Sequence, residues 1–196
     1  LILTTVLLAR RWTFASAIVL GLTVAVKHSA WFFLPFYFFY MLPERVTRAA
    51  LRDAVVRMIP GVIVAAIVFI PFLIWDGAAF IDDTVSYVLG TSGNSFPMKG
   101  WGFSTLLLAA RVIPSPESAF PFSLFEILFG LPMLVWLLAR QHRENTLRQV
   151  WFGFAAISFV IEYFSRFFND NYVVFVVQAL VIASFITPIQ FDDANA

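Results

Sequence analysis

The sequence predicts an all-α protein, built as a polytopic transmembrane helical bundle. Of its 196 residues, 61% are hydrophobic and 13% are charged, against a charged fraction of about 25% in an average soluble domain. The mean hydropathy is +0.86, and 24 residues are Phe. A water-soluble domain of this length would have to expose much of that apolar surface. At about 20 residues per span, we expect about six spans and an N-terminal half-helix, in one domain over residues 1–196.

Composition also argues against several classes of function. The formal net charge of +1 gives no basic surface for nucleic acid, so we expect no nucleic-acid partner. Cys is absent, which excludes disulfides, thiolate nucleophiles and Cys-ligated metals, and the two His residues do not make a His-rich metal centre. We therefore predict no cofactor, with a divalent cation left open as the alternative. The expected partner is the lipid bilayer.

Three groups of arginines orient the predicted spans. They are Arg10 and Arg11; Arg45, Arg48, Arg52 and Arg57; and Arg140, Arg143 and Arg148. The positive-inside rule places all three groups, and with them both ends of the chain, on the cytoplasmic side. The chain opens with the apolar run LILTTVLLA, which reaches the first group after half a membrane helix. We therefore expect it to be the C-terminal part of a longer protein.

The first half of the chain contains three predicted spans. Residues 12–42 must cross an even number of times, because arginine groups flank them. The break at Lys27 leaves two helices of about 14 residues, or roughly 21 Å, which is short for a hydrocarbon core of about 30 Å and would suit a bundle with a cavity. Residues 43–58 are predicted to form a cytoplasmic interfacial helix beginning at Pro43, and residues 59–75 to form the next span.

The second half begins with an acidic segment that fits the outer side. No basic residue occurs between Asp76 and Lys99. Residues 78–90 are amphipathic and are predicted to form a helix ending at Gly90. The run 102–113 is too short to span, so we interpret it as a re-entrant or interfacial helix ended by Pro114. The remaining spans are predicted over residues 121–139, 150–165 and 171–188.

Cations on the outer side oppose the topological bias and mark the candidate site. Lys27, Lys99 and Arg166 come from three separate loops at the same predicted depth. Lys27 and His28 are predicted to bind an anion such as a lipid-linked phosphate, and Arg166 to bind a substrate phosphate. Two alternatives stay open. Lys27 and His28 would form a simple polar hairpin, and Arg166 would pair with Glu162, four residues earlier on one helix.

A second set of residues has the chemistry of acidic or sugar-binding groups, each with a structural alternative. Asp82 and Asp83 suit metal or acid–base work, or form the wet face of an amphipathic helix. Asp170 is either functional or a turn residue. Trp31 and Tyr172 would stack on a sugar or lie at the membrane interface as aromatic residues commonly do.

Three stretches of the chain are similar to integral-membrane glycosyltransferases of the GT-C superfamily, including polyprenyl-phosphate-sugar-dependent mannosyltransferase-like proteins. The first is GLTVAVKHSAWFFLPF, in which Gly21, Lys27, Trp31 and Pro35 match. The second, WDGAAFIDDTVSYVLGTSGNSFPMKGWGFSTLL, resembles an outer loop of these enzymes, and the third, RFFNDNYVVFVVQALVIA, resembles their last outer loop and span. Many relatives carry Arg-Tyr where this chain has Asn171-Tyr172.

The resemblance implies an inverting hexosyltransferase of the bacterial plasma membrane, which moves a sugar from a polyprenyl-phosphate donor to an acceptor on the outer side. It assigns Lys27, His28, Lys99 and Arg166 to the donor phosphate. The family's catalytic acid lies in a first outer loop that we expect outside residues 1–196, so the catalytic residue is left unassigned. Two other classes stay open: a non-catalytic multi-pass membrane subunit, and a transporter, against which the charges at the outer interface argue.

Overall fold

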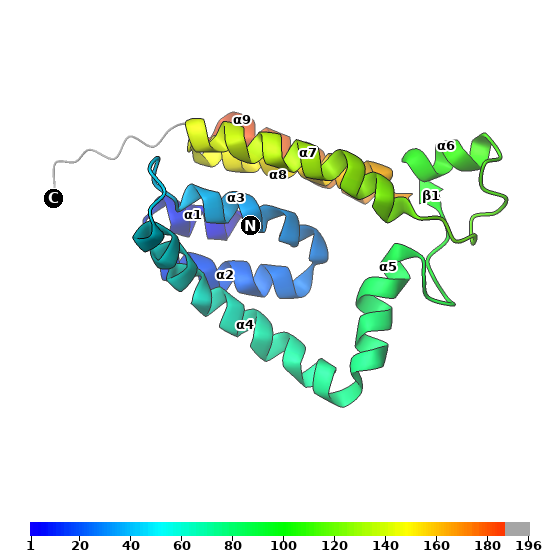
Figure 1. The fold of residues 1–196 in the computed structure, drawn as a ribbon, viewed down its shortest axis with the longest axis horizontal. Helices are drawn as coiled ribbons and strands as arrows, with labels where there is room; N and C mark the ends of the chain where they lie inside the picture. The colour runs from blue at the N-terminus through cyan, green and yellow to red at the C-terminus, as the bar shows by residue number, and fades with distance from the viewer. Residues whose placement is uncertain (187–196) are drawn as a thin grey trace. The chain divides into compact units, whose positions relative to one another are not determined.

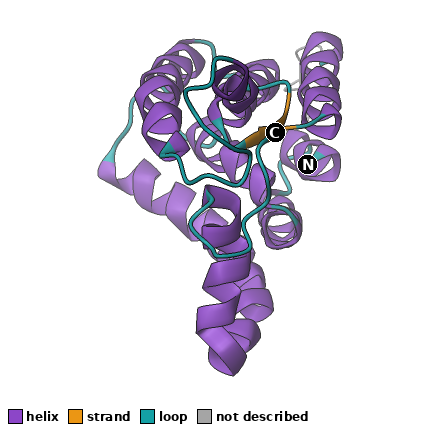
Figure 2. Ribbon diagram, turned by 90° about the vertical axis from the view of Figure 1, so that its right-hand side faces the viewer, coloured by secondary structure: helices purple, strands orange, loops and turns teal. Residues whose placement is uncertain are grey.

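A computed structural model describes residues 1–186 as an almost entirely helical chain, which confirms the predicted all-α class (Figure 1). The α-helices are α1 (Ile2–Ala9), α2 (Thr13–Val26), α3 (Leu34–Tyr40), α4 (Arg48–Ile81), α5 (Tyr87–Leu89), α6 (Phe103–Ala109), α7 (Phe122–Arg143), α8 (Leu147–Phe164) and α9 (Asp170–Phe185). A 3₁₀ segment, η1 (His28–Phe33), precedes α3, and a π-helical segment, η2 (Asp82–Ser86), joins α4 to α5. The short strands β1 (Lys99–Gly100) and β2 (Phe167–Phe168) form a parallel pair, orange in Figure 2.

Two helices of the described chain are long and apolar enough to cross a membrane. They are the helical stretch Arg48–Leu89, which contains α4, and α7. Only 6% and 17% of the residues in their most apolar windows are buried. A core helix of a soluble protein would be mostly buried, so the exposure of these two helices favours contact with lipid. α2 and α9 are also apolar but shorter, with 14 and 16 residues.

The chain forms two compact units, each assembled from segments distant in sequence. The first unit holds residues 1–65, 138–154 and 179–186, and the second holds residues 66–137 and 155–178. α4, α7, α8 and α9 each contribute residues to both units. The single domain expected over residues 1–196 stays a prediction, and the expected end of the last span at residues 187–188 lies outside the described residues.

An aromatic core centred on Phe33 holds the first unit together. Phe33 is fully buried, and its ring meets those of Trp151 and Phe154 edge-on at centroid distances of 5.5 and 5.3 Å. Edge-to-face packing of this kind contributes beyond the area it buries. The Trp151 indole N–H donates to Thr5 Oγ1 over 3.0 Å, which satisfies its polar end and ties α8 to α1.

Small residues allow α2 and α4 to cross closely in the first unit. A Cβ atom added to Gly21 would clash with the backbone of Gly61, and one added to Gly61 would clash with the carbonyl of Ala17. Ala17 and Gly21, like Gly61 and Ala65, are four residues apart and so lie on one helix face. This small-xxx-small spacing is typical of helices that pack closely in membranes.

The break predicted at Lys27 is confirmed. α2 ends at Val26, and Lys27 takes an extended backbone conformation with φ −147° and ψ 124°. The indole N–H of Trp31 donates to the carbonyl of Val24 over 3.0 Å, which satisfies one of the carbonyls left without a partner at the end of α2. The Trp31 side chain therefore stabilises the end of α2, where the chain changes direction.

The separate interfacial helix predicted over residues 43–58 is wrong. α4 begins at Arg48, not Pro43, because the Thr47 hydroxyl accepts a hydrogen bond from the Ala50 N–H over 3.1 Å and caps the helix. The helix then continues without a break as far as Asp76, whose φ of −150° and ψ of 85° interrupt it. The Asp76 carboxylate accepts from the Ala79 N–H and restarts the helix.

The amphipathic segment that follows ends as predicted, and the next helix ends early. Gly90 closes α5 in the left-handed conformation, with φ +79°. α6 occupies the predicted place but stops at Ala109, because Arg111 takes a left-handed conformation with φ +57°. The expected end at Pro114 is therefore wrong by about one helical turn.

Candidate functional site

The β1–β2 pair brings two of the candidate loops together in the second unit. Lys99 pairs with Phe167 and Gly100 with Phe168, and the Trp101 N–H donates to the Phe168 carbonyl over 2.8 Å. Gly100 has φ +105°, and a Cβ there would clash with the backbone of Phe168, so only Gly permits this approach. We call the side chains around this pair the β1–β2 cluster: Phe96, Lys99, Trp101, Arg166 and Asp170.

Arg166 is the buried centre of the β1–β2 cluster. Only 1% of its surface is exposed, and its guanidinium donates to three backbone carbonyls. Nε donates to Phe96 O, Nη1 to Ser118 O over 2.9 Å and Nη2 to Pro116 O over 3.1 Å. Burial lowers the pKa of Arg166 from its ordinary value, while the nearby Glu117 carboxylate opposes that shift. Arg166 thus fastens two stretches of loop to the start of β2.

Gly90 lies against this guanidinium. A Cβ atom added to Gly90 would lie 2.6 Å from Arg166 Nη1 and 3.1 Å from its Cζ. The residue that ends the amphipathic segment therefore also makes room for the arginine. Any other residue would have to adopt an unfavourable positive φ and displace the guanidinium.

Lys99 and Trp101 are the exposed members of the β1–β2 cluster. The Lys99 Nζ lies 5.7 Å from the centroid of the Phe96 ring, within range of a cation–π interaction. The Phe96 ring packs in turn on Phe167 at 5.1 Å. Trp101 is 71% exposed, and its indole N–H donates to the carboxylate of Asp170 at the start of α9. An ammonium and an indole held by such contacts could meet a phosphate and a sugar ring.

Lys27 and His28 lie in the first unit, and both are exposed. Partial desolvation by the surrounding chain, and to a lesser extent the positive charge of Lys27, lower the pKa of His28 from 6.5. Trp31 is half-exposed on η1. The structure thus brings Lys99 and Arg166 into one cluster, and the grouping of all four cations stays a prediction.

The acidic candidates and Tyr172 lie in the second unit. Asp82 and Asp83 are exposed on η2, and the Asp82 carboxylate accepts from the Ser92 hydroxyl over 2.8 Å. Tyr172 is buried, and its ring packs against Phe167 at 6.1 Å. Within residues 1–186, no group of three or more His, Cys, Asp or Glu side chains is placed to hold a metal ion.

Sequence reasoning missed Phe96, Gly90 and the carbonyls of residues 116–118 as parts of this site. Phe96 offered only its position three residues before Lys99, as one of 24 Phe residues in the chain. The carbonyls carry no sequence signal, because every residue has one. Comparisons with family models, curated proteins and solved structures found no match to this chain.

Proposed function

We propose that the chain is a multi-pass membrane protein of the bacterial plasma membrane, with six spans and both ends cytoplasmic. The exposed apolar surfaces of α4 and α7 support this proposal, because water would solvate them poorly. The three arginine groups support the orientation. Asp76, which interrupts α4 directly after the predicted span 59–75, supports a span that ends at an interface.

Within that membrane protein, the activity we propose is transfer of a sugar from a lipid-linked phosphate donor to an acceptor on the outer side, as in GT-C glycosyltransferases. The observation that carries it is an exposed ammonium and an exposed indole two residues apart, Lys99 and Trp101, on a frame held by Arg166. The ammonium complements a phosphate, and the flat apolar face of the indole complements a sugar ring.

Four residues of the cluster have distinct roles in this proposal. The acceptor oxygen attacks the sugar C1 from the face opposite the phosphate, and the bond from C1 to the phosphate oxygen breaks with its electron pair going to that oxygen. Lys99 stabilises the departing phosphate by its positive charge. Trp101 holds the sugar, and Asp170 orients the indole. Arg166 is a positioning residue. A base outside this cluster takes the acceptor proton.

Binding of a polyprenyl phosphate to the purified protein in nanodiscs tests this proposal. We expect the Lys99→Gln variant to bind at least about tenfold more weakly, a change of about 1.4 kcal/mol. Arg111→Gln is the matched control, since Arg111 is an exposed cation of the same unit outside the cluster. The same polyprenol without phosphate should bind both proteins equally. Equal phosphate binding by the wild type and Lys99→Gln would reject the site.

A second candidate, a non-catalytic membrane subunit, is favoured by one observation. The Arg166 guanidinium is directed to backbone carbonyls, so it builds the loops of the second unit. A subunit would need such a frame for a partner protein and would bind no donor. The two candidates therefore differ in the polyprenyl phosphate titration, which only the enzyme should answer.

A further inference from the structure

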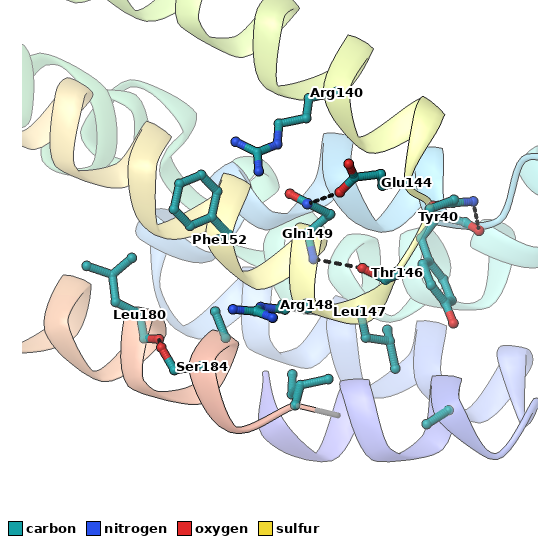
Figure 3. A pocket seen from close by; sticks show the side chains of 14 residues that line it. Tyr40, Arg140, Glu144, Thr146, Leu147, Arg148, Gln149, Phe152, Leu180 and Ser184 are labelled. Atoms are coloured by element: carbon teal, nitrogen blue, oxygen red, sulfur yellow. Dashed lines mark hydrogen bonds between the residues drawn. The ribbon is translucent and has the colours of Figure 1, made fainter. Parts of the chain in front are cut away.

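A pocket in the first unit shares no lining residue with the β1–β2 cluster. It has a volume of about 850 Å³ and opens where α7 ends, α8 begins and α9 ends (Figure 3). Its lining is mixed: Arg140, Arg148 and Gln149 give it polar groups, and Phe152 and Leu180 give it apolar surface. Sequence reasoning used the two arginines for topology alone.

Positive charge reaches this pocket from two helices. Arg140 extends from the last turns of α7 toward Phe152, and its Cζ lies 5.5 Å from the centroid of that ring (Figure 3). Arg148 lies in the first turn of α8. The first turn of a helix also presents N–H groups and the positive end of the helix dipole. Both arginines are exposed, so their guanidinium groups are accessible to a ligand.

The pocket's carboxylate is engaged by a neighbour. Glu144 accepts a hydrogen bond from Gln149 Nε2 over 2.7 Å (Figure 3). The Gln149 backbone N–H donates to the Thr146 hydroxyl over 3.2 Å, which caps the start of α8. With two arginines and one glutamate in its lining, the pocket has a net formal charge of +1.

The apolar surface next to the pocket places it at the edge of a hydrophobic layer. On α9, Phe185 is 81% exposed between the lining residues Ser184 and Ile186. On α9, Val181 is 48% exposed between the lining residues Leu180 and Ala183. Exposed apolar side chains that give way to arginines mark the level of lipid headgroups.

We infer that this pocket binds a phosphate-bearing anion, held between Arg140 and Arg148. The phosphate would come either from the headgroup of an anionic membrane lipid or from a soluble phosphate ester. Guanidinium groups bind phosphate oxygens through paired N–H donors. The N-terminus of α8 also favours a negative charge, through its N–H groups and the helix dipole. The inference does not depend on the proposed function, because no residue of the β1–β2 cluster lines the pocket.

Native mass spectrometry of the detergent-solubilised protein tests the inference. The probes are phosphatidylglycerol, the zwitterionic phosphatidylcholine, and soluble glycerol 3-phosphate. We expect at least about tenfold weaker binding of the preferred phosphate probe in Arg140→Gln and in Arg148→Gln. Arg143→Gln is the matched control, because Arg143 is exposed three residues after Arg140 on α7 and does not line the pocket.

The pattern of probes identifies the source of the phosphate. Loss of phosphatidylglycerol alone in the arginine variants supports a lipid headgroup, and loss of glycerol 3-phosphate supports a soluble ester. If both arginine variants bind phosphatidylglycerol and glycerol 3-phosphate as tightly as the wild type does, the inference is overturned. Ser184→Phe, which fills the pocket without changing its charge, gives a second test, since Ser184 lines it at α9. It should also reduce binding, and unchanged binding would contradict the site.

Discussion

The guanidinium of Arg166 lies against Gly90, at a place where a Cβ atom would come within 2.6 Å of Nη1. The two residues are distant in sequence, yet each restricts which residue type the other position can hold. Arg166 needs the space that only Gly leaves, and Gly90 needs its positive φ to end the preceding helical segment. We therefore expect a substitution at either residue to destabilise the loops of the second unit.

Replacing Gly90 by Ala should destabilise the protein by about 1–3 kcal/mol, through an unfavourable backbone conformation and displacement of the guanidinium. Thermal unfolding in detergent, monitored by size-exclusion chromatography, measures the loss of stability. Gly93→Ala is the control, because nothing lies within 4 Å of a Cβ at that position. Equal stability of the two variants would show that Gly90 and Arg166 do not depend on each other.

Arg166→Lys should free the loops that the guanidinium holds. A lysine has no planar fork and cannot reach three carbonyls in the same way, so we expect a loss of about 2–4 kcal/mol. Limited proteolysis between residues 91 and 118 should become faster, while Arg111→Lys should be cut like the wild type. Weaker polyprenyl phosphate binding with unchanged proteolysis would instead assign Arg166 directly to the phosphate.

The Gly21→Leu variant should separate α2 from α4. The added side chain meets the backbone of Gly61, which cannot move as a flexible side chain would, so we expect a loss of about 1–3 kcal/mol. Gly77→Ala, at a position with nothing within 4 Å, should be neutral or slightly stabilising. Thermal unfolding compares the two, and a stable Gly21→Leu protein would contradict the close crossing.

His28 should titrate below 6.5 and make stability depend on pH. The unfolded chain binds the proton more readily, so stability rises with pH between the lowered pKa of folded His28 and 6.5. The His28 contribution is present above 6.5 and is lost as pH falls through the folded value. Because the chain has two His residues, NMR of the His142→Asn variant follows His28 alone. Lys27→Gln should raise its pKa, and an unchanged value would contradict the contribution of Lys27.

Thiol labelling tests the proposed orientation, and the chain's lack of Cys gives it no background. A Cys at Gly93 should react with an impermeant reagent in intact cells. A Cys at Arg143 should react only after permeabilisation. Both positions are exposed, so access to the compartment decides the result. The reverse pattern would overturn the topology.

Local signals in the sequence predicted much of the helical fold. The polar break at Lys27 and the glycine at position 90 end their helices as expected, because both act on their immediate neighbours. The start of α4 differs from the predicted start at Pro43 because the Thr47 side chain caps the helix, and Thr is a weaker sequence signal than Pro. The end of α6 was missed because Arg111 adopts a conformation that arginine rarely takes.

The candidate site was predicted only in part. Charge alone singled out Lys99 and Arg166, and the structure brings both to the β1–β2 pair. Sequence reasoning offered Arg166 a carboxylate or a phosphate, whereas its three observed hydrogen-bond acceptors are backbone carbonyls. Strands of two residues have no detectable alternation, so their pairing could not be foreseen.

Arg166 also sets an order in time for the making of this protein. It is synthesised 70 residues after Phe96 and 48 residues after Ser118, the two ends of the loop that it fastens. Until the ribosome has passed α8, those carbonyls lack the guanidinium that donates to them in the folded chain. The loop that carries Lys99 and Trp101 is thus synthesised before the residue that fixes its conformation. A nascent chain released before Arg166 would leave this loop accessible to proteases and chaperones.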